Sequence, residues 1–521
     1  AWQLPAHNSY IRDTPQLILP DVTRPVMDLF ACETGALLAC AAYLLEEEFN
    51  AVSPFILTCI EDNLKRRILL PYLTAHFWWM GHDNEPMCNW TVWCTQNVLL
   101  TTFLMPWSVE MSSRLSAPLR TFCGNAPLFL PENTSDTVVT LQAILHKAAE
   151  SCDYFLKDYG NDGCCEEGAQ YYRHAGLCLY GAMTVLNTVT DGHFYTLFRW
   201  DKVKNIASYI LNVHVNDKYY FNFADCSPIA GRAGVREYLF GKATGQEDLC
   251  LFAAKDFQAG QGQLVTDEVN GGNLFYRMQT VFHYEELIKQ DTSGTLSHRD
   301  VYYPSVGLFL VHSDTLDLAV KAGDNADSHN HNDTGSITLY KNGLPVLADI
   351  GVETYTRKTF SPRRYEIWTM QSGYHNLPTI CGTDQKDGVE YRAEKVVTEL
   401  TGAEPSISME LAAAYPDAGA VVPGLTYSRR VTLKKSSNTV VLEDHTNAQD
   451  VILNFITYEK PVILSDGKLS IGEASASFEG ADLLAIETLP ITDARLRTAW
   501  DHDLYRIRLK GNDAGFRLTI Q

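Results

Sequence analysis

The most informative stretch of this chain reads Ser328-His329-Asn330-His331-Asn332-Asp333-Thr334-Gly335-Ser336, and the apolar run Ile337-Thr338-Leu339-Tyr340 follows it directly. Imidazole, carboxylate and amide groups are concentrated there, immediately before a predicted strand. Imidazoles two residues apart on an extended chain point to the same face, whereas a turn between them would let one bind a metal while the other faces a substrate. A polar turn capped by Asn and Asp is the alternative interpretation.

The sequence after about residue 297 is typical of antiparallel β structure. Short segments rich in β-branched and aromatic residues predict strands over 307–311, 336–340, 427–434, 439–443 and 505–509. Turn sequences join neighbouring strands at hairpin spacing, namely Lys341-Asn342-Gly343, Ser465-Asp466-Gly467 and Lys510-Gly511-Asn512. This half of the chain therefore predicts an antiparallel sandwich.

The sequence before about residue 290 shows apolar residues at a spacing near 3.6, which predicts helices. The stretches with this pattern cover 27–49, 51–73, 89–104, 136–159, 166–186, 201–213 and 274–289. In the first of them, one predicted apolar stripe is formed by Phe30, Leu37, Leu38, Ala41 and Leu45. We therefore expect an all-helical half built from many antiparallel helices.

Composition limits the classes of protein that fit. The chain has 521 residues, of which 45% are hydrophobic and 20% charged, enough for at least two domains. Its net charge of −21 argues against nucleic-acid binding, so an anionic ligand would need a local basic cleft. No apolar run approaches the roughly 18 residues of a membrane helix, and no membrane partner is expected.

Cysteine usage bears on the compartment. The 13 cysteines are scattered without paired metal-ligand spacing, and the adjacent Cys164-Cys165 pair is a poor disulfide. This pattern favours buried thiols in a reducing compartment such as a bacterial cytoplasm, while a mature secreted or periplasmic form stays open.

A candidate metal-ligand set follows the opening stretch. Asp349 ends the apolar strand Val346-Leu347-Ala348, and His375 lies in Ser372-Gly373-Tyr374-His375-Asn376. Together with His331 they form a set of two histidines and one carboxylate, of the kind that binds Zn²⁺ or Mn²⁺. Taken singly, each of the three would be an ordinary structural residue.

Two groups in the predicted helical half carry candidate reactive or binding side chains. Glu167, Tyr171, Tyr172 and His174 lie at a predicted helix entrance, where a capped helix start with aromatic core residues is the alternative. Upstream, an amide and two indoles could form a sugar subsite by stacking, or could simply be core residues; these are Asn89, Trp90 and Trp93.

These segments together resemble the heparinase II/III-like polysaccharide lyases. The family's His-x-His-Asn-Asp-x-Gly-Ser, Asp-x-Gly and Ser-x-x-His-Asn motifs match residues 329–336, 349–351 and 372–376, and Ser361-Pro362-Arg363-Arg364-Tyr365 is similar to the family's lead-in. Asn89-Trp90 and Glu167-Gly168-x-x-Tyr171 match shorter and weaker motifs. The resemblance covers roughly residues 80 to 380.

The resemblance implies a multidomain α+β fold. Residues 1–295 would form an incomplete (α/α) toroid, and residues 296–521 an antiparallel β-sandwich, with a small C-terminal β subdomain from about residue 390 as an option.

The resemblance also implies β-elimination at a uronic acid of an acidic glycan such as heparan sulfate, hyaluronan or chondroitin, which leaves a 4,5-unsaturated uronic acid end. Such an enzyme must neutralise the C6 carboxylate, remove the C5 proton and protonate the departing O4. Asn89 would bind the carboxylate, and a tyrosine ionised by nearby cations would exchange protons together with His329. The family spacing selects Tyr171, and Tyr172 stays open as the alternative.

The resemblance to the family implies further residue roles. Trp90, Glu167, Arg363 and Arg364 would contact the substrate, although a structural salt bridge is an equal alternative for the arginines. One divalent ion, Zn²⁺ or Mn²⁺, would be held by His331, Asp349 and His375, and it would support a loop without taking part in the chemistry.

Three other functions stay open at this point. A glycoside hydrolase would need a carboxylate pair, for which Glu167 and Asp333 are candidates. An alginate-type lyase and a non-catalytic glycan-binding protein are the others. The sequence does not specify the glycan, the mode of attack or the oligomeric state.

Overall fold

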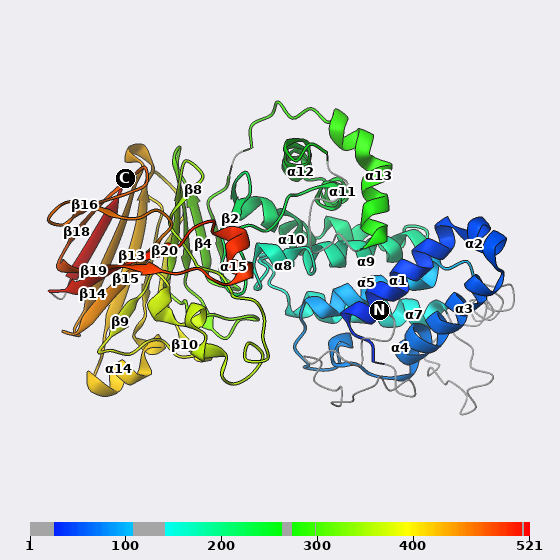
Figure 1. Ribbon diagram of the computed structural model, residues 1–521, viewed down its shortest axis with the longest axis horizontal. Coiled ribbons are helices and arrows are strands. Elements are labelled where there is room, and N and C mark those ends of the chain that lie inside the picture. The colour runs from blue at the N-terminus through cyan, green and yellow to red at the C-terminus, as the bar shows by residue number, and fades with distance from the viewer. Residues whose placement is uncertain (1–25, 108–140, 263–272, 297, 513–514) are drawn as a thin grey trace. The chain divides into compact units, whose positions relative to one another are not determined.

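The computed structural model describes residues 26–107, 141–262, 273–296, 298–512 and 515–521 (Figure 1). The chain divides into two compact units, and each is described by itself. Unit 1 comprises Ala1–Tyr159, Arg173–Ala207 and Arg232–Ser293, and unit 2 comprises Gly160–Tyr172, Ser208–Gly231 and Gly294–Gln521.

Unit 1 is built from helices. They are α1 (Leu29–Leu44), α2 (Glu46–Val52), α3 (Phe55–Leu64), α4 (Leu70–Thr74), α5 (Asn89–Leu104), α7 (Leu141–Asp158), α9 (Gly176–Val189), α11 (Val235–Thr244), α12 (Glu247–Ala259) and α13 (Leu274–Lys289). Helix α10 (Asp201–Asn212) begins in unit 1 and ends in unit 2.

The predicted helices are confirmed where the periodicity is long and uninterrupted. The bounds of α5 and α13 coincide with the predictions, whereas 51–73 is divided into α3, the π-helical turn Lys65–Leu69 and α4. The stretch 166–186 is divided into α8 (Ala169–Tyr172) and α9. Of the predicted helix 136–159, residues 136–140 lie outside the described residues.

The expectation of an all-helical first half was wrong. A hairpin of β1 (His214–Asn216) and β2 (Tyr219–Tyr220) interrupts it, and the turn places Asp217 at a φ of 47°. Aspartate tolerates this left-handed conformation better than most residues, so the short polar turn Asn216-Asp217-Lys218 reverses the chain. Strands of three and two residues are too short to be identified from periodicity.

The helix predicted over 27–49 is divided into α1 and α2, which are bent by 85° at their junction, and the buried face of α1 differs from the predicted one. Asp28 caps the helix, because its Oδ1 accepts a hydrogen bond of 2.7 Å from the Ala31 amide. The buried side is made of small residues, and a Cβ on Gly35 would come within 2.9 Å of Thr101 Oγ1 on α5. Of the predicted stripe, Phe30, Leu37 and Leu45 are exposed, whereas Leu38 and Ala41 are partly buried and Leu38 packs against the core. Because α1 packs closely against α5, the buried side of α1 accommodates small side chains and not large apolar ones.

No single helix in the described ranges is long and apolar enough to cross a bilayer. Helices α1 and α2 reach that length and composition only together, and they are bent by 85° at their junction.

Unit 2 contains two large antiparallel sheets. The nine-stranded sheet has the order β19-β20-β15-β8-β7-β5-β4-β3, with β9 paired to β15. Its strands are β3 (Val301–Tyr303), β4 (Leu308–His312), β5 (Leu316–Lys321), β7 (Ile337–Lys341), β8 (Leu344–Leu347), β9 (Pro378–Ile380), β15 (Val451–Thr457), β19 (Ala481–Leu489) and β20 (Leu504–Gly511).

The eight-stranded sheet has the order β11-β12-β13-β14-β21-β18-β17-β16. Its strands are β11 (Glu394–Glu399), β12 (Ser406–Glu410), β13 (Tyr427–Lys434), β14 (Thr439–Thr446), β16 (Val462–Ser465), β17 (Lys468–Ile471), β18 (Ala474–Glu479) and β21 (Gly515–Ile520). A smaller pair joins β6 (Asp324–Asn325) to β10 (Gly388–Arg392), and the short helices α14 (Pro416–Val421) and α15 (Ala494–Ala499) complete the unit.

The two large sheets share one hydrophobic core, as in a sandwich. Leu318 of β5 and Phe455 of β15 lie in the same buried cluster as Val431 of β13 and Leu442 of β14. The sandwich predicted from the sequence is therefore confirmed, and strands from both sides of residue 390 belong to these sheets.

Candidate active site and metal-ligand cluster

A buried carboxylate of unit 2, Asp225, gathers several candidate residues. Its Oδ1 accepts hydrogen bonds from His331 Nε2 at 3.0 Å and Arg364 Nη2 at 2.6 Å, and its Oδ2 accepts from His329 Nδ1 at 2.8 Å and the Tyr355 hydroxyl at 3.0 Å. Burial alone would raise the pKa of Asp225, but the hydrogen bonds from His329 and His331 outweigh it and hold the pKa well below its usual range. The carboxylate is therefore ionised and fixes both imidazoles.

The backbone at His329 explains how two histidines of one motif reach the two oxygens of one carboxylate. His329 adopts a left-handed φ of 60°, which is uncommon for a residue other than glycine. Arg364 holds this turn, because its Nη2 donates to the His329 carbonyl at 2.9 Å and its Nε to the Asn330 carbonyl at 3.0 Å. Backbone strain of this kind persists only where the surroundings enforce it, and it is often found at functional sites.

Tyr171 joins this group, and its neighbour Tyr172 does not. The Tyr171 ring stacks on His329 with centroids 4.8 Å apart, and its hydroxyl forms a short hydrogen bond with that of Tyr355. Tyr172 is fully buried and packs against Tyr209, with ring centroids 5.9 Å apart. The geometry therefore favours Tyr171 of the two tyrosines left open by the sequence.

The protonation of Tyr171 differs from the expectation. Burial raises the pKa of Tyr171 to about 12, although the positive charge of Arg495 acts in the opposite direction. The phenol is therefore neutral near pH 7, whereas the sequence suggested ionisation by nearby cations. A neutral phenol is suited to donating a proton.

His329 is shifted toward its charged form. Burial lowers the pKa of His329, but the hydrogen bond to Asp225 and the negative charges of Glu167 and Asp225 outweigh this, and the net shift is upward. Glu167 is itself buried, and Gly168 follows it at a φ of +87°. A Cβ on Gly168 would come within 2.6 Å of Cys226 Cβ, so glycine is required there.

Three residues of this network were not among the sequence candidates: Asp225, Tyr355 and Arg495. Arg495 lies in the first turn of α15, donates to the Asp225 carbonyl at 3.1 Å, and places its guanidinium carbon 4.4 Å from the Tyr355 ring centroid. Tyr355 lies a few residues after the Asp349-Ile350-Gly351 motif, and this proximity is a sequence signal that could have identified it. Asp225 and Arg495 lie in no motif.

The predicted metal ligands lie together. His331, Asp349 and His375 are all buried, and one ligand atom from each lies within 4.8 Å of the others. His331 Nδ1 and His375 Nε2 have no hydrogen-bond partner among the described residues. Buried imidazole nitrogens without partners are costly, so a bound cation would fit this set.

Neighbouring side chains hold the candidate ligands in place. Asp225 holds the other nitrogen of His331, which is the carboxylate–histidine arrangement common around metal ligands. Asp349 Oδ1 accepts from the Gly351 amide at 2.9 Å and from Asn222 Nδ2 at 3.2 Å, and its Oδ2 lies 2.9 Å from His375 Nδ1. The carboxylate is thereby oriented.

The two predicted arginines differ in their contacts. Arg363 is exposed and forms an ion pair with Glu366, with Nη2 and Oε2 2.8 Å apart. Arg364 donates hydrogen bonds within the protein. The acceptors are the Asp225 carboxylate, the carbonyls of His329 and Asn330, and the Thr359 carbonyl at 3.2 Å. Arg364 thus positions the opening stretch.

The candidates of unit 1 are found at α5. Asn89 is its first residue and is buried, and Trp90 packs at the edge of a hydrophobic core, with its ring 5.2 Å from that of Trp78. Trp90 is half-buried, so packing at the core edge and a contact with a ligand both fit its position.

One turn further along α5, Trp93 makes two contacts. Its Nε1 donates to Glu33 at 2.9 Å, and its ring stacks on His174 with centroids 3.9 Å apart. Burial raises the pKa of Glu33, against the opposing effect of the Trp93 hydrogen bond. Trp93 and His174 are therefore partners within unit 1.

Comparison with known proteins agrees with this architecture. The sequence model of the family described as "Heparinase II/III-like, C-terminal" matches residues 295–452. The resemblance seen in the sequence is thereby confirmed: the chain contains a heparinase II/III-like C-terminal region. A search of curated proteins finds no match.

Solved structures of similar fold carry lyase names. A heparinase III is 13% identical with a TM-score of 0.54, and the match covers 94% of this chain and 67% of that one. A mutant of the heparan sulfate lyase HepC from Pedobacter heparinus is 12% identical with a TM-score of 0.56, covering 93% and 68%. The chondroitin AC lyase of Streptomyces coelicolor A3, in complex with chondroitin sulphate, is 8% identical with a TM-score of 0.50, covering 96% and 68%. At these identities the likeness shows the fold.

Proposed function

We propose that this protein is a polysaccharide lyase that cleaves a uronic-acid-containing glycosaminoglycan by β-elimination. The observation that carries the proposal is the stacked pair of Tyr171 and His329, both tied to the ionised Asp225. The names of the structurally similar lyases, which act on heparan sulfate or hold chondroitin sulphate, support the same class of substrate. In this proposal unit 1 corresponds to an incomplete (α/α) toroid.

The two proton transfers can be assigned to two residues. Asp225 accepts from Nδ1 of His329, so the neutral imidazole presents the lone pair of Nε2 as the base for the C5 proton. Tyr171 holds its proton near pH 7 and gives it to O4. The C5–H bond and the C4–O4 bond break, the C4=C5 double bond forms, and the proton on His329 then returns to Tyr171 or to water.

Tyr355 and Arg495 support the transient phenolate. Tyr355 bridges Tyr171 to Asp225 through its hydroxyl, and the charge of Arg495 favours the ionised form of both phenols. A positive group beside a developing anion stabilises it most effectively in a buried site.

The remaining roles rest on the family resemblance. Asn89 is proposed to bind the uronate carboxylate, and Trp90, Glu167 and Arg363 to contact the glycan. The net charge of −21 favours a weakly sulfated chain or a short oligosaccharide over a densely sulfated one, because long-range repulsion is then smaller.

One divalent ion, Zn²⁺ or Mn²⁺, is proposed to bind His331, Asp349 and His375. The unpartnered nitrogens His331 Nδ1 and His375 Nε2 support this assignment. When bound, the ion would supply a rigid anchor for the loop. His331 would then hold Asp225, and through it the reactive His329, in place.

The test is a panel of uronic-acid glycans with Tyr171→Phe and a matched control, Tyr172→Phe. We expect the wild type to produce ultraviolet-absorbing C4=C5 ends and Tyr171→Phe to lose activity by about 100-fold or more, the usual effect of removing an acid–base group. Tyr172→Phe should stay within a few-fold of wild type. A large loss of activity in Tyr172→Phe together with near wild-type activity in Tyr171→Phe would assign the catalytic role to Tyr172.

The same assay separates the alternatives. Reducing ends without absorbance would indicate a hydrolase, for which the buried Glu167 and Asp333 would be the carboxylates. Absorbance from alginate alone would indicate an alginate-type lyase, and binding without any product a glycan-binding protein. Each of these results would refute the proposed glycosaminoglycan lyase.

A further inference from the structure

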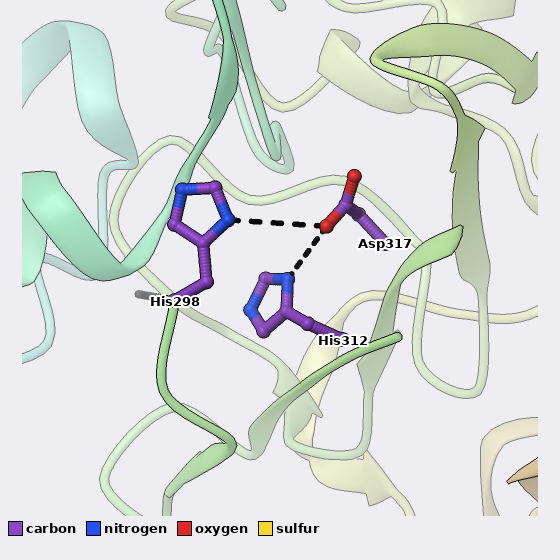
Figure 2. Close-up of side chains that lie close together, drawn as sticks. All are labelled: His298, His312 and Asp317. Carbon is purple, nitrogen blue, oxygen red and sulfur yellow. Dashed lines mark hydrogen bonds and ion pairs between the residues drawn. The ribbon is translucent and has the colours of Figure 1, made fainter. Parts of the chain in front are cut away.

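A second group of histidines and a carboxylate lies in unit 2, and it shares no residue with the network around Asp225. His312 Nδ1 lies 2.8 Å from Asp317 Oδ1, and His298 Nδ1 lies 4.0 Å from the same oxygen. One ligand atom from each residue lies within 4.8 Å of the others. Figure 2 shows the two imidazoles on one side of the carboxylate, with a nitrogen of each turned toward the shared oxygen.

The β4–β5 hairpin builds half of this group. His312 ends β4 and is the register partner of Asp317 on β5, so the two side chains share one face of the sheet. The His312 amide donates to Asp300 Oδ1 at 3.0 Å, and Asp300 Oδ2 lies 2.5 Å from Lys435 Nζ. The backbone that carries His312 is therefore fixed independently of its side chain.

The other half comes from the segment before β3. His298 lies there, and its ring is 4.9 Å from that of His312 and 6.2 Å from that of His214 on β1. Two separate chain segments thus place imidazoles beside one carboxylate, and a third segment places His214 next to His298. No motif in the sequence indicates this group, because its residues are distributed without regular spacing.

Burial and access favour a ligand role. His298 and His312 each turn one ring nitrogen toward the same carboxylate oxygen, so both imidazoles can offer a lone pair to an ion bound there. His312 is buried, and the nitrogen that faces the group is Nδ1, whose partner is Asp317 Oδ1 within the group itself. The side chains of His298 and Asp317 are 22% and 15% exposed, which leaves a path for an ion.

We propose that His298, His312 and Asp317 form a second metal site, which binds one divalent transition-metal ion, with Zn²⁺ the best match. Two imidazoles and one carboxylate are a donor set that Zn²⁺ accepts, and a fourth position is then left for water or His214. Tetrahedral Zn²⁺ separates its ligand atoms by about 3.3 Å. The observed separations of 2.8 and 4.0 Å lie on either side of that value, so small side-chain rotations suffice.

The site would have a structural consequence that does not depend on the proposed lyase function. Strand β3 is the edge strand of the nine-stranded sheet, and His298 precedes it by three residues. An ion bound here would fasten the chain leading into β3 to the β4–β5 hairpin. Zn²⁺ would then protect the edge of the sheet against fraying.

The first experiment measures metal stoichiometry on the full chain. The protein is stripped with a chelator, dialysed against excess Zn²⁺, freed of unbound ion and assayed by elemental analysis. We expect the wild type to retain one more Zn²⁺ per chain than His298→Gln or Asp317→Asn. His445→Gln, which removes an exposed histidine from β14 of the same unit, should match the wild type.

Two comparisons make the result decisive. His331→Ala should lose a different ion, so that His298→Gln combined with His331→Ala retains less than either single variant. Equal Zn²⁺ content in the wild type and in folded His298→Gln, with circular dichroism confirming the fold, would overturn the second site. That result would leave the proposed lyase function untouched.

A second readout uses Co²⁺ and heat. Co²⁺ bound by nitrogen and oxygen ligands absorbs visible light, and the absorbance should fall in His298→Gln and Asp317→Asn but persist in His445→Gln. Zn²⁺ should raise Tm more in the wild type than in His298→Gln. An identical Co²⁺ spectrum and an identical rise in Tm in both proteins would refute the proposal.

Discussion

Asp225 is the residue on which the proposed chemistry depends most, because it holds both His329 and Tyr355 and keeps His329 biased toward its charged form. Proton removal from C5 needs the neutral imidazole, so kcat/KM should rise as pH increases through the pKa of His329. The upward shift of that pKa places the rise at a higher pH than a free histidine would give, above about 6.5.

Asp225→Asn should move this rising limb to lower pH, because it removes the negative charge that favours the imidazolium. The measurement is the pH profile of kcat/KM, supported by an NMR titration of the His329 ring. Glu167→Gln removes a second negative charge that raises the same pKa, and it should shift the limb in the same direction. A limb that stays in place or moves to higher pH in both variants would contradict the assignment of His329 as the base.

Stability should follow a related dependence. A histidine whose pKa is raised on folding stabilises the fold below its unfolded pKa, and this contribution is lost as pH rises through the folded pKa. The His329–Asp225 pair therefore contributes most to the free energy of unfolding on the acidic side of neutrality, as long as Asp225 stays ionised.

The sequence identified His329 and Tyr171 but not Asp225. The first two stand in patterned motifs, whereas Asp225 follows an aromatic run and becomes a ligand-holding carboxylate only through long-range folding. A single buried acid has no local signature in the sequence.

At the scale of elements, the sequence predicted where helices and strands lie better than which faces they bury. β13 was predicted with its observed bounds, since Tyr427, Val431 and Leu433 lie an even number of positions apart and all face the core. For α1 the helix was right and the face was wrong, because contact with α5 requires small residues such as Gly35 and leaves Phe30 exposed. Hydrophobicity predicts which side chains are buried only where two helices do not pack so closely that small residues are required between them.

The short helix α8 depends on one glycine. Gly168→Ala should lower the free energy of unfolding by about 1–2 kcal/mol for the left-handed backbone alone, and further for the contact with Cys226. It should also reduce activity, because α8 carries Tyr171. Urea denaturation and the lyase assay measure the two effects.

Gly402→Ala is the matched control. Gly402 has the same φ of +87° but nothing within 4 Å of an added Cβ, so only the backbone cost applies and activity should be unchanged. Equal losses of stability in the two variants would show that the alanine Cβ at position 168 is accommodated beside Cys226 without a further loss of folding free energy.

At the scale of the whole molecule, the sequence suggested one boundary near residue 295, with helices before it and strands after it. The compact units follow a different division, because 160–172 and 208–231 cluster with the sandwich although they precede the boundary. Periodicity describes a segment's own conformation and carries no information about which distant segment it packs against.

Metal binding should stabilise unit 2 as a whole. His331→Ala should lose one bound ion per chain and lower Tm, because an ion present at 100 times its Kd adds about 2.7 kcal/mol to the free energy of unfolding. Elemental analysis and thermal unfolding measure the two effects, with His445→Ala as the control. A wild-type protein that binds no ion after exposure to Zn²⁺ or Mn²⁺ would refute the ligand set.

The interleaved course of the chain through unit 2 also limits how this protein can be recombined. A gene fusion that transfers only the family-matching region 295–452 would inherit His329 and the three proposed metal ligands, but neither Tyr171 nor Asp225. The fusion would therefore lack the phenol that stacks on His329 and the carboxylate that orients the His329 imidazole. Proteins that share only this C-terminal region can therefore inherit part of the sandwich and the proposed metal ligands without inheriting the proposed reaction.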